Sequence, residues 1–195
     1  MLTDRILGAF MFRSTVYAEV EDDASFTQSA WLIVAVTALL SALGTNAAYG
    51  FGNIVGWLVA TLVTAVFMVA GFALAAFLVA FVGKSLFQAE IDFEQAVRVM
   101  GLAYVWNVVG FIGVVGAITP LLACVLAPIS FVAAIAGLAA WLIAIKEALD
   151  LDWGRSIVVV LVAWLASVIV TGIATTILAL MGFTAGSMLS MFSGS

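Results

Sequence analysis

Three acidic residues, Glu90, Asp92 and Glu94, stand at alternate positions in a short hydrophilic stretch. Their carboxylates can form a patch that docks a partner or binds a cation weakly, although charge runs are more often solvated faces. Gln95 follows Asp92 at the spacing of a capping box, in which the Asp side chain accepts from the first free N–H groups of a helix. We therefore interpret Asp92 as a helix cap, and Glu90 and Glu94 as the candidate partner-docking residues.

Other groups that commonly carry catalysis or bind metals are scarce. The chain has no histidine, and its one cysteine, Cys124, stands in an apolar run. A histidine proton shuttle, a thiolate cluster and a disulfide framework are therefore excluded. Asp150 and Asp152 resemble the beginning of a calcium loop, but the roughly six oxygen ligands of such a loop are not completed downstream. We expect no catalytic residue, metal site or cofactor, and we interpret Asp152 as a helix cap.

The long apolar stretches contain no Asp, Glu, Lys, Arg or His, the groups that proton-driven carriers usually place at their sites. Asn107 is the most polar residue of the third stretch, and we expect it to hydrogen-bond a neighbouring helix rather than a substrate. Gly110, Gly113 and Gly116 recur at every third position nearby. Because small residues let helix backbones approach closely in lipid, these residues predict packing seams between spans or between protomers.

The overall composition requires a bilayer. Hydrophobic residues make up 66% of the 195 residues and charged residues only 9%, whereas soluble domains carry roughly 25% charged residues. The mean hydropathy of +1.32 agrees, since so few polar groups cannot cover a globule in water. The formal net charge of −5 argues against nucleic acid as a partner and leaves membrane lipids as the expected surroundings.

Long intervals without charge separate the clusters of charged residues. No Asp, Glu, Lys or Arg stands between Asp23 and Lys84 or between Arg98 and Lys146, and none follows Arg155. A membrane span needs about 20 apolar residues. Each of the first two intervals therefore suits two helices, and the last interval suits one.

Breaks within the two longer intervals complete the assignment. A small, polar stretch at 44–53 divides the first interval, and Pro120 divides the second, since proline cannot donate to the helix ladder. The sequence thus predicts an all-α fold, a polytopic transmembrane bundle of five spans, at about 28–48, 54–82, 100–118, 121–145 and 157–181.

The positive charges predict the orientation. All six Lys and Arg residues precede the first span or lie in the loops after the second and the fourth. The positive-inside rule makes this side cytoplasmic, with the N-terminus inside and the C-terminus outside. Residues 1–27 then form a cytosolic segment, 28–182 the membrane domain and 183–195 a short external tail. Bulky apolar residues at helical spacing over 3–17 predict an interfacial amphipathic helix in the cytosolic segment, capped by Thr3.

This layout resembles the Yip-one domain family (Ypt-interacting protein family), most specifically in two stretches. Residues 83–104 begin with GKS and lead into the third span with FEQAVRVMGLAY, and residues 141–159 contain WLIAIKEAL followed by GRSIVV. Two residues depart from the family pattern. Leu102 stands where the family often has tyrosine, and Trp106 stands where a proline often follows. The compact form is similar to prokaryotic members, which implies the cytoplasmic membrane of a prokaryote. Without the Pro-rich arm of the eukaryotic trafficking members, binding to Rab-type GTPases is not expected.

Two classes of function remain open. The leading hypothesis is a non-enzymatic membrane protein that acts by association, as an organiser or adaptor, with protein partners on the cytoplasmic face or with a second copy of itself. The alternative is a permease or lipid-handling protein with an apolar or zwitterionic cargo. An intramembrane enzyme comes third, because its polar groups would have to come from loops. A cavity between the spans favours the permease or lipid-handling protein, whereas a solid bundle with an exposed seam favours the adaptor.

Overall fold

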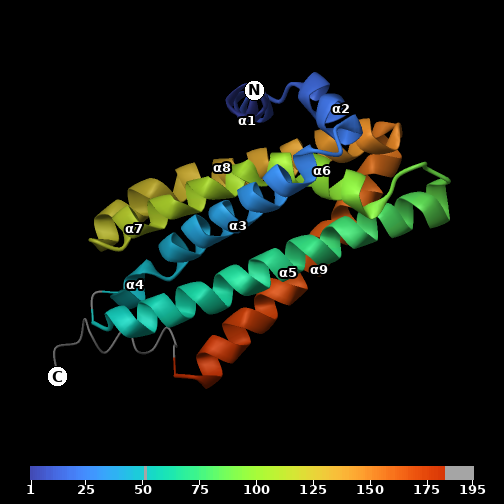
Figure 1. Ribbon diagram of the computed structural model, residues 1–195. Helices are drawn as coiled ribbons and strands as arrows, with labels where there is room; N and C mark the ends of the chain where they lie inside the picture. The colour runs from blue at the N-terminus through green and yellow to red at the C-terminus, as the bar shows by residue number, and fades with distance from the viewer. Residues whose placement is uncertain (51, 183–195) are drawn as a thin grey trace.

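The computed structural model describes residues 1–50 and 52–182, which fold almost entirely into helices (Figure 1). Within these residues, five helical segments are long and apolar enough to cross a membrane. The predicted all-α membrane bundle of five spans is confirmed, while the predicted tail at 183–195 lies outside the described residues. The elements are α1 (Leu2–Phe10), α2 (Ser14–Asp22), α3 (Phe26–Thr45), α4 (Ala47–Gly50), α5 (Ile54–Phe87), α6 (Phe93–Ala103), the 3₁₀ helix η1 (Tyr104–Ile112), α7 (Gly113–Gly116), α8 (Pro120–Leu149) and α9 (Trp153–Leu180).

Short polar side chains determine where the long helices begin. Asn53, Asp92, Thr119 and Asp152 each accept a hydrogen bond from a backbone N–H in the first turn of α5, α6, α8 and α9 respectively. Asp92 and Gln95 make both bonds of a capping box, at 2.7 and 2.8 Å. Such caps satisfy donors that have no partner inside the helix. The predicted caps Asp92 and Asp152 are confirmed.

The third span differs from the continuous helix expected over 100–118. Its helix begins at Phe93, directly after the predicted cap Asp92, but it changes from α-helix to 3₁₀ helix over Tyr104–Ile112, before one last α turn at Gly113–Gly116. Runs of 3₁₀ helix longer than about four residues are uncommon, because their hydrogen-bond geometry is poorer. Residues three apart lie above one another in a 3₁₀ helix. Asn107 and Gly110 therefore belong to one row along this span.

The N-terminal segment forms two helices rather than the single helix expected over 3–17. The chain turns at Phe12, whose φ of 55° lies in the left-handed region. Met1, and not Thr3, precedes the first helical residue. We call residues 2–22 the N-terminal hairpin. Its second helix packs against α6 and α8 and buries Val16 and Tyr17, so the hairpin belongs to the folded bundle.

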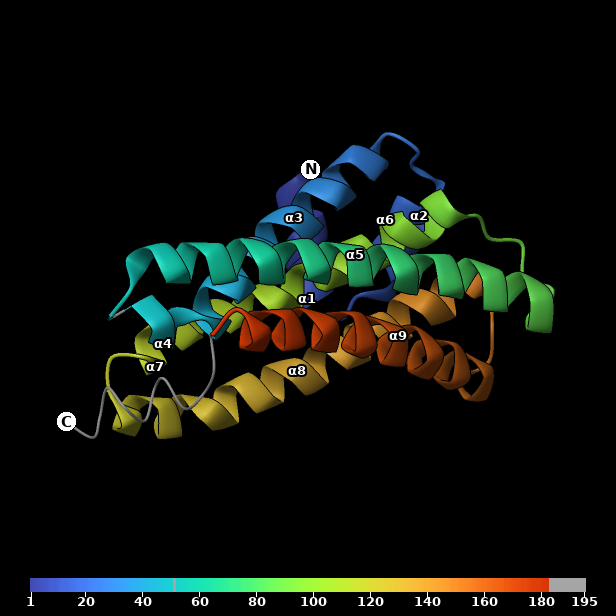
Figure 2. The same ribbon diagram turned by 90° about the horizontal axis from the view of Figure 1, so that it is seen from below.

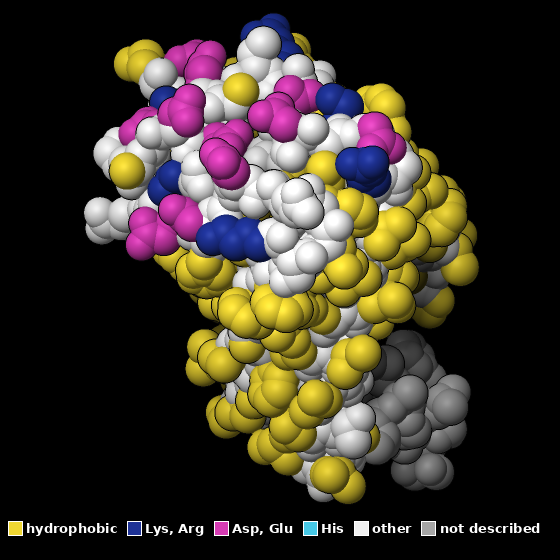
Figure 3. All heavy atoms as spheres, turned by 90° about the vertical axis from the view of Figure 1, so that its right-hand side faces the viewer, with side chains coloured by type: hydrophobic (Ala, Val, Ile, Leu, Met, Phe, Trp, Pro, Cys, Tyr) yellow, Lys and Arg dark blue, Asp and Glu magenta, His cyan; other side chains and the backbone are white. Residues whose placement is uncertain are grey.

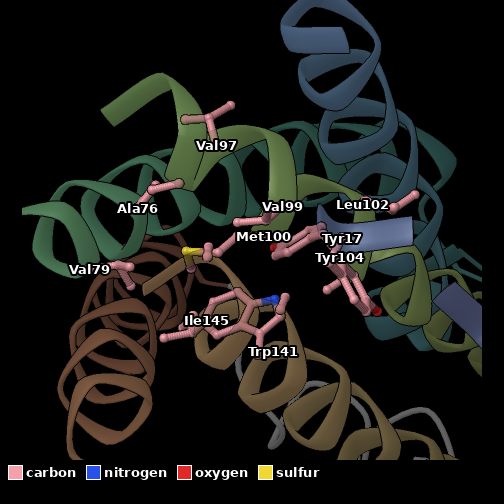
Figure 4. Packing of buried hydrophobic residues seen from close by; sticks show 14 of the residues in the cluster. Tyr17, Ala76, Val79, Val97, Val99, Met100, Leu102, Tyr104, Trp141 and Ile145 are labelled. Atoms are coloured by element: carbon pink, nitrogen blue, oxygen red, sulfur yellow. The ribbon is translucent and has the colours of Figure 1, made fainter. Parts of the chain in front are cut away.

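A continuous apolar core occupies one half of the bundle. Tyr17, Phe72, Met100 and Ile145 are almost fully buried in it. Figure 4 shows side chains of α2, α5, α6 and α8 meeting at this core, with Trp141 of α8 among them. This half adjoins the end of the bundle that carries the charged residues, and we call that end the charged end. The opposite end of the bundle is the uncharged end.

Toward the uncharged end the helices separate. Figures 1 and 2 show α8 and α9 close together where the chain connects them, and diverging toward Pro120 and Leu180. Along its length α9 packs mainly on α5, while α8 packs on α6 and η1. The early part of α8 exposes large apolar side chains such as Leu121 and Phe131. The core therefore does not extend evenly through the spans.

Candidate functional site

A cavity of about 570 Å³ lies between the spans, in the half of the bundle that the core does not fill. Its volume falls within the roughly 300–1,000 Å³ that is usual for ligand pockets. Residues of α3, α5, η1, α8 and α9 line it, and several of them, such as Ser130 and Thr175, are exposed at its side. We call this cavity the groove. Its polar lining residues are Ser41, Asn107, Ser130, Ser167, Thr171 and Thr175, and its aromatic ones are Tyr104, Trp106, Trp141 and Trp164.

Four hydroxyl groups of the groove are bonded to their own helices. In α9, the Oγ of Ser167 donates to the carbonyl of Trp164 at 2.8 Å, and the Oγ1 of Thr171 donates to the carbonyl of Ser167 at 2.9 Å. Thr175 and Ser130 make the same kind of bond, at 2.7 and 3.3 Å. A hydroxyl has one proton and two lone pairs. These oxygens therefore remain able to accept a hydrogen bond.

Asn107 lines the groove and does not make the interhelical bond expected of it. Its Nδ2 donates to the carbonyl of Tyr104 at 3.1 Å, within its own span. Asn46 makes an interhelical bond of this kind, since its Nδ2 donates to the Oγ1 of Thr64 in α5 at 3.0 Å. Sequence reasoning placed Asn46 in a break between spans. The structure places it at the end of α3, with only 4% of its surface exposed.

Two of the three singled-out glycines lie where the third span meets α3. A Cβ atom at Gly113 would stand 2.5 Å from the carbonyl oxygen of Gly44, and one at Gly110 would overlap the Oγ of Ser41. At Gly116 the nearest atom is the Cα of Ala123, at 3.4 Å, so this residue faces α8. Gly110 also lines the groove. The close approach of α3 and η1 therefore positions one wall of the groove.

Glu90 and Glu94 lie at the charged end, away from the groove. Both side chains are exposed, that of Glu90 in the connection between α5 and α6 and that of Glu94 in the first turn of α6. The buried Ile91 anchors the connection. The nearest guanidinium atom of Arg98 is 4.0 Å from the Oε2 of Glu94. Figure 3 shows acidic and basic side chains gathered at this end, above a surface that is mostly hydrophobic.

Arg98 has a structural role that sequence reasoning missed. Only 5% of its surface is exposed. Its Nε donates to the carbonyls of Val20 and Glu21 at 3.1 and 3.0 Å, and its Nη1 donates to the Oγ1 of Thr27 at 3.3 Å. These carbonyls end α2, where a cation satisfies free acceptors and complements the helix dipole. The sequence did contain a signal for this burial, because the neighbours of Arg98 in the helix that begins after Asp92 are apolar.

Two carboxyl groups beside this contact have shifted pKa values. The pKa of Glu21 is raised to about 7, mainly by burial and also by the nearby carboxylates of Asp22 and Asp150, against the opposing effect of Arg98. Hydrogen bonds from Ser25 and Arg5 lower the pKa of Asp23. Arg5 also forms an ion pair with Asp23 at 2.8 Å, which ties α1 to the segment before α3. Polar contacts at the charged end thus join the hairpin to the bundle, in addition to the apolar packing of Val16 and Tyr17.

Within the described residues, no group of three or more His, Cys, Asp or Glu side chains is placed to hold a metal ion.

Comparison with known proteins agrees with the architecture. No curated protein and no solved structure matches the chain significantly. The Yip1 domain matches residues 8–175, a range that contains every residue lining the groove. The chain is therefore an integral membrane protein and belongs to the Yip1 domain family.

Proposed function

We propose that this protein is a non-enzymatic lipid-handling protein, which binds part of a membrane lipid in the groove between α8 and α9. The observation that carries the proposal is the groove itself, a space of about 570 Å³ between the spans. A solid bundle would have favoured an adaptor, and this bundle is solid only near its charged end. The spans instead separate toward the uncharged end, where an apolar molecule can enter from the side.

The lining suits a lipid better than a water-soluble solute. Most of it is apolar or aromatic, and no Lys, Arg, Asp or Glu of the described chain takes part in it. Ligand pockets are mostly apolar with a few polar groups that orient the ligand. Because the groove lies within spans and opens beside exposed apolar side chains of α8, acyl chains are the molecules most abundant at its mouth.

Crosslinking with a photoactivatable phospholipid, whose reactive group is on an acyl chain, tests this function in reconstituted vesicles. We expect labelled peptides to come mainly from η1, α8 and α9. Ala134→Phe, which places a ring in the groove, should lower this labelling severalfold. Ile135→Phe is the matched control, because Ile135 is 52% exposed and does not line the groove. Labelling spread evenly over all lipid-facing helices, or unchanged by Ala134→Phe, would contradict the proposal.

A second candidate function is that of an adaptor, and the exposed carboxylates of Glu90 and Glu94 favour it. If the charged end is cytoplasmic, as the positive residues predict, these groups face soluble partners. Changing both to glutamine while keeping the cap Asp92 should leave folding intact, because exposed ion pairs contribute only about 0–1 kcal/mol. The double variant should lose a co-purifying partner that wild type retains at low salt. A partner that stays bound to the variant would remove this candidate.

A further inference from the structure

The groove offers hydrogen-bond acceptors in an ordered row. Ser167, Thr171 and Thr175 are four residues apart in α9, and residues at this spacing lie on one face of an α-helix. Each of the three hydroxyls gives its proton to a carbonyl of α9 itself. Ser130, in α8, is bonded in the same way to the carbonyl of Leu126. These four hydroxyls thus present oxygen lone pairs to the groove, and their own protons are already used.

This arrangement selects against charged lipid headgroups. A phosphate needs hydrogen-bond donors and cationic side chains, and the described groove lining contains neither Lys nor Arg. An ammonium group could donate to the oxygens, but it would leave water without a carboxylate beside it, which is costly within a membrane. A ligand that complements the row therefore carries a hydrogen-bond donor and no charge.

We infer that the groove binds an uncharged lipid alcohol, a molecule with acyl chains and one free hydroxyl group, of which diacylglycerol is the simplest example. This inference rests on the proposed lipid-handling function and narrows it to one class of lipid. The acyl chain lies against the aromatic and aliphatic lining, and the hydroxyl donates to an oxygen of the row Ser167, Thr171 and Thr175. Without a charge, such a polar end can lie at the depth of the spans at modest cost.

Three ligands that share the same acyl chains test the inference. Dioleoylglycerol carries the free hydroxyl, its methyl ether lacks only that donor, and dioleoyl phosphatidate replaces it with an anion. We expect native mass spectrometry of the full chain in detergent to show binding of dioleoylglycerol at least about fivefold tighter than of the other two, the order expected from one net hydrogen bond. Equal binding of the alcohol and its ether, or tighter binding of the phosphatidate, would overturn the inference.

Variants of α9 locate the contact. Changing Thr171 and Thr175 together to valine keeps the side-chain shape and removes two acceptors, so it should weaken the preference for the alcohol over the ether. Thr176→Val is the matched control, because Thr176 donates to the same carbonyl of Gly172 as Thr175 but does not line the groove. A preference that survives when the double variant is combined with Ser167→Ala, which removes the remaining acceptor of the row, would also overturn the inference.

The same experiment separates this inference from the proposed function. If the alcohol and the ether bind equally and Ala134→Phe displaces both, the protein binds lipid in the groove without choosing alcohols. If none of the three binds, or Ala134→Phe has no effect on binding, the lipid-handling function itself fails. A second copy of the chain in the groove would appear as a dimer that Ala134→Phe dissociates, and this result would overturn both proposals.

Discussion

The guanidinium of Arg98 lies among the carbonyl groups that end α2, so one buried side chain of the third span holds the N-terminal hairpin in place. The last carbonyls of a helix have no partner inside the helix, and Val20 and Glu21 find theirs in Arg98. A hydrogen bond to a charged donor contributes about 1.5–3 kcal/mol net. Removing the guanidinium also leaves these carbonyls buried without their donor.

Arg98→Met should therefore loosen the hairpin while the spans stay folded. We expect hydrogen exchange over α2 to speed up by an amount that corresponds to a loss of about 1.5–3 kcal/mol of local stability. Arg155→Met is the control, because Arg155 is exposed and pairs with Asp152 only at the surface; its loss should change stability by about 0–1 kcal/mol. Equal exchange in both variants would show that Arg98 does not hold the hairpin.

The buried carboxyl of Glu21 should make the docking of the hairpin sensitive to pH. Its pKa rises from an ordinary value of 4.5 to about 7 in the folded protein, mainly through burial. Between these values the docked hairpin binds more protons than the undocked one. Glu21 therefore favours docking fully below about pH 4.5, and this contribution is lost as the pH rises through 7.

Exchange over α2 should accordingly be faster at pH 8 than at pH 6, after correction for the intrinsic pH dependence of exchange. Glu21→Gln should remove the difference, because a glutamine does not ionise, whereas the exposed Glu19→Gln should retain it. Asp23 does not contribute in this range, since its pKa is lowered. A pH dependence that persists in Glu21→Gln would assign the effect to another group.

At the level of elements, the contact between α3 and the third span leaves no room for side chains. The backbone carbonyl of Gly44 stands where a Cβ of Gly113 would lie. A backbone atom cannot turn aside as the end of a flexible side chain can. Any residue larger than glycine at position 113 therefore has to push the two spans apart, and this movement also shifts the wall of the groove.

Gly113→Ala should lower the free energy of unfolding in detergent by on the order of 1–3 kcal/mol, the usual cost of overpacking. Gly172→Ala provides the control, since a Cβ there has no neighbour within 4 Å and alanine favours a helix over glycine by roughly 1 kcal/mol. It should be neutral or stabilising. If the two variants unfold alike in a thermal or denaturant series, Gly113 is not at a tight contact.

Helix starts were predictable from the sequence, but the inner course of the third span was not. The caps Asp92 and Asp152 depend on residues two or three positions away, so local reasoning finds them. The change from α6 to η1 accompanies the contact with α3, which lies far away in the sequence. For the same reason we expected an interhelical bond from Asn107, which lies inside a span, and not from Asn46. The partner of Asn46 is Thr64, and only the folding of the chain brings these two residues together.

For the whole molecule, the orientation in the membrane is the property that most needs a direct test. Single cysteines at Gly52 and Ile118, in a background with Cys124→Ala, should react with an impermeant thiol reagent from outside intact cells. Cysteines at Glu19 and Glu90 should react only after lysis, because the positive-inside rule predicts that the charged end faces the cytoplasm. All four positions are exposed. Labelling of Glu90→Cys from outside would reverse the orientation.

The number of spans was predictable because charged residues are excluded from the bilayer interior. This exclusion leaves long apolar intervals in the sequence of a membrane-spanning protein. The groove was not predictable in this way. Residues that face lipid and residues that line the groove are drawn from the same apolar types, as Ala134 and Ile135 illustrate. Only the divergence of α8 from α9 distinguishes them, and that depends on how all the spans pack together.

The bond between Arg98 and the carbonyl of Val20 joins residues 78 positions apart, and this separation determines the order in which the protein can assemble during synthesis. The N-terminal hairpin leaves the ribosome first, but the residue that holds it is made two spans later. At translation rates of about 5–20 residues per second, the hairpin waits on the order of 4–16 seconds for that residue. During this interval the apolar face of the hairpin that later contacts α6 and α8 is not covered by protein. The membrane surface is then the nearest apolar environment to which this face can bind.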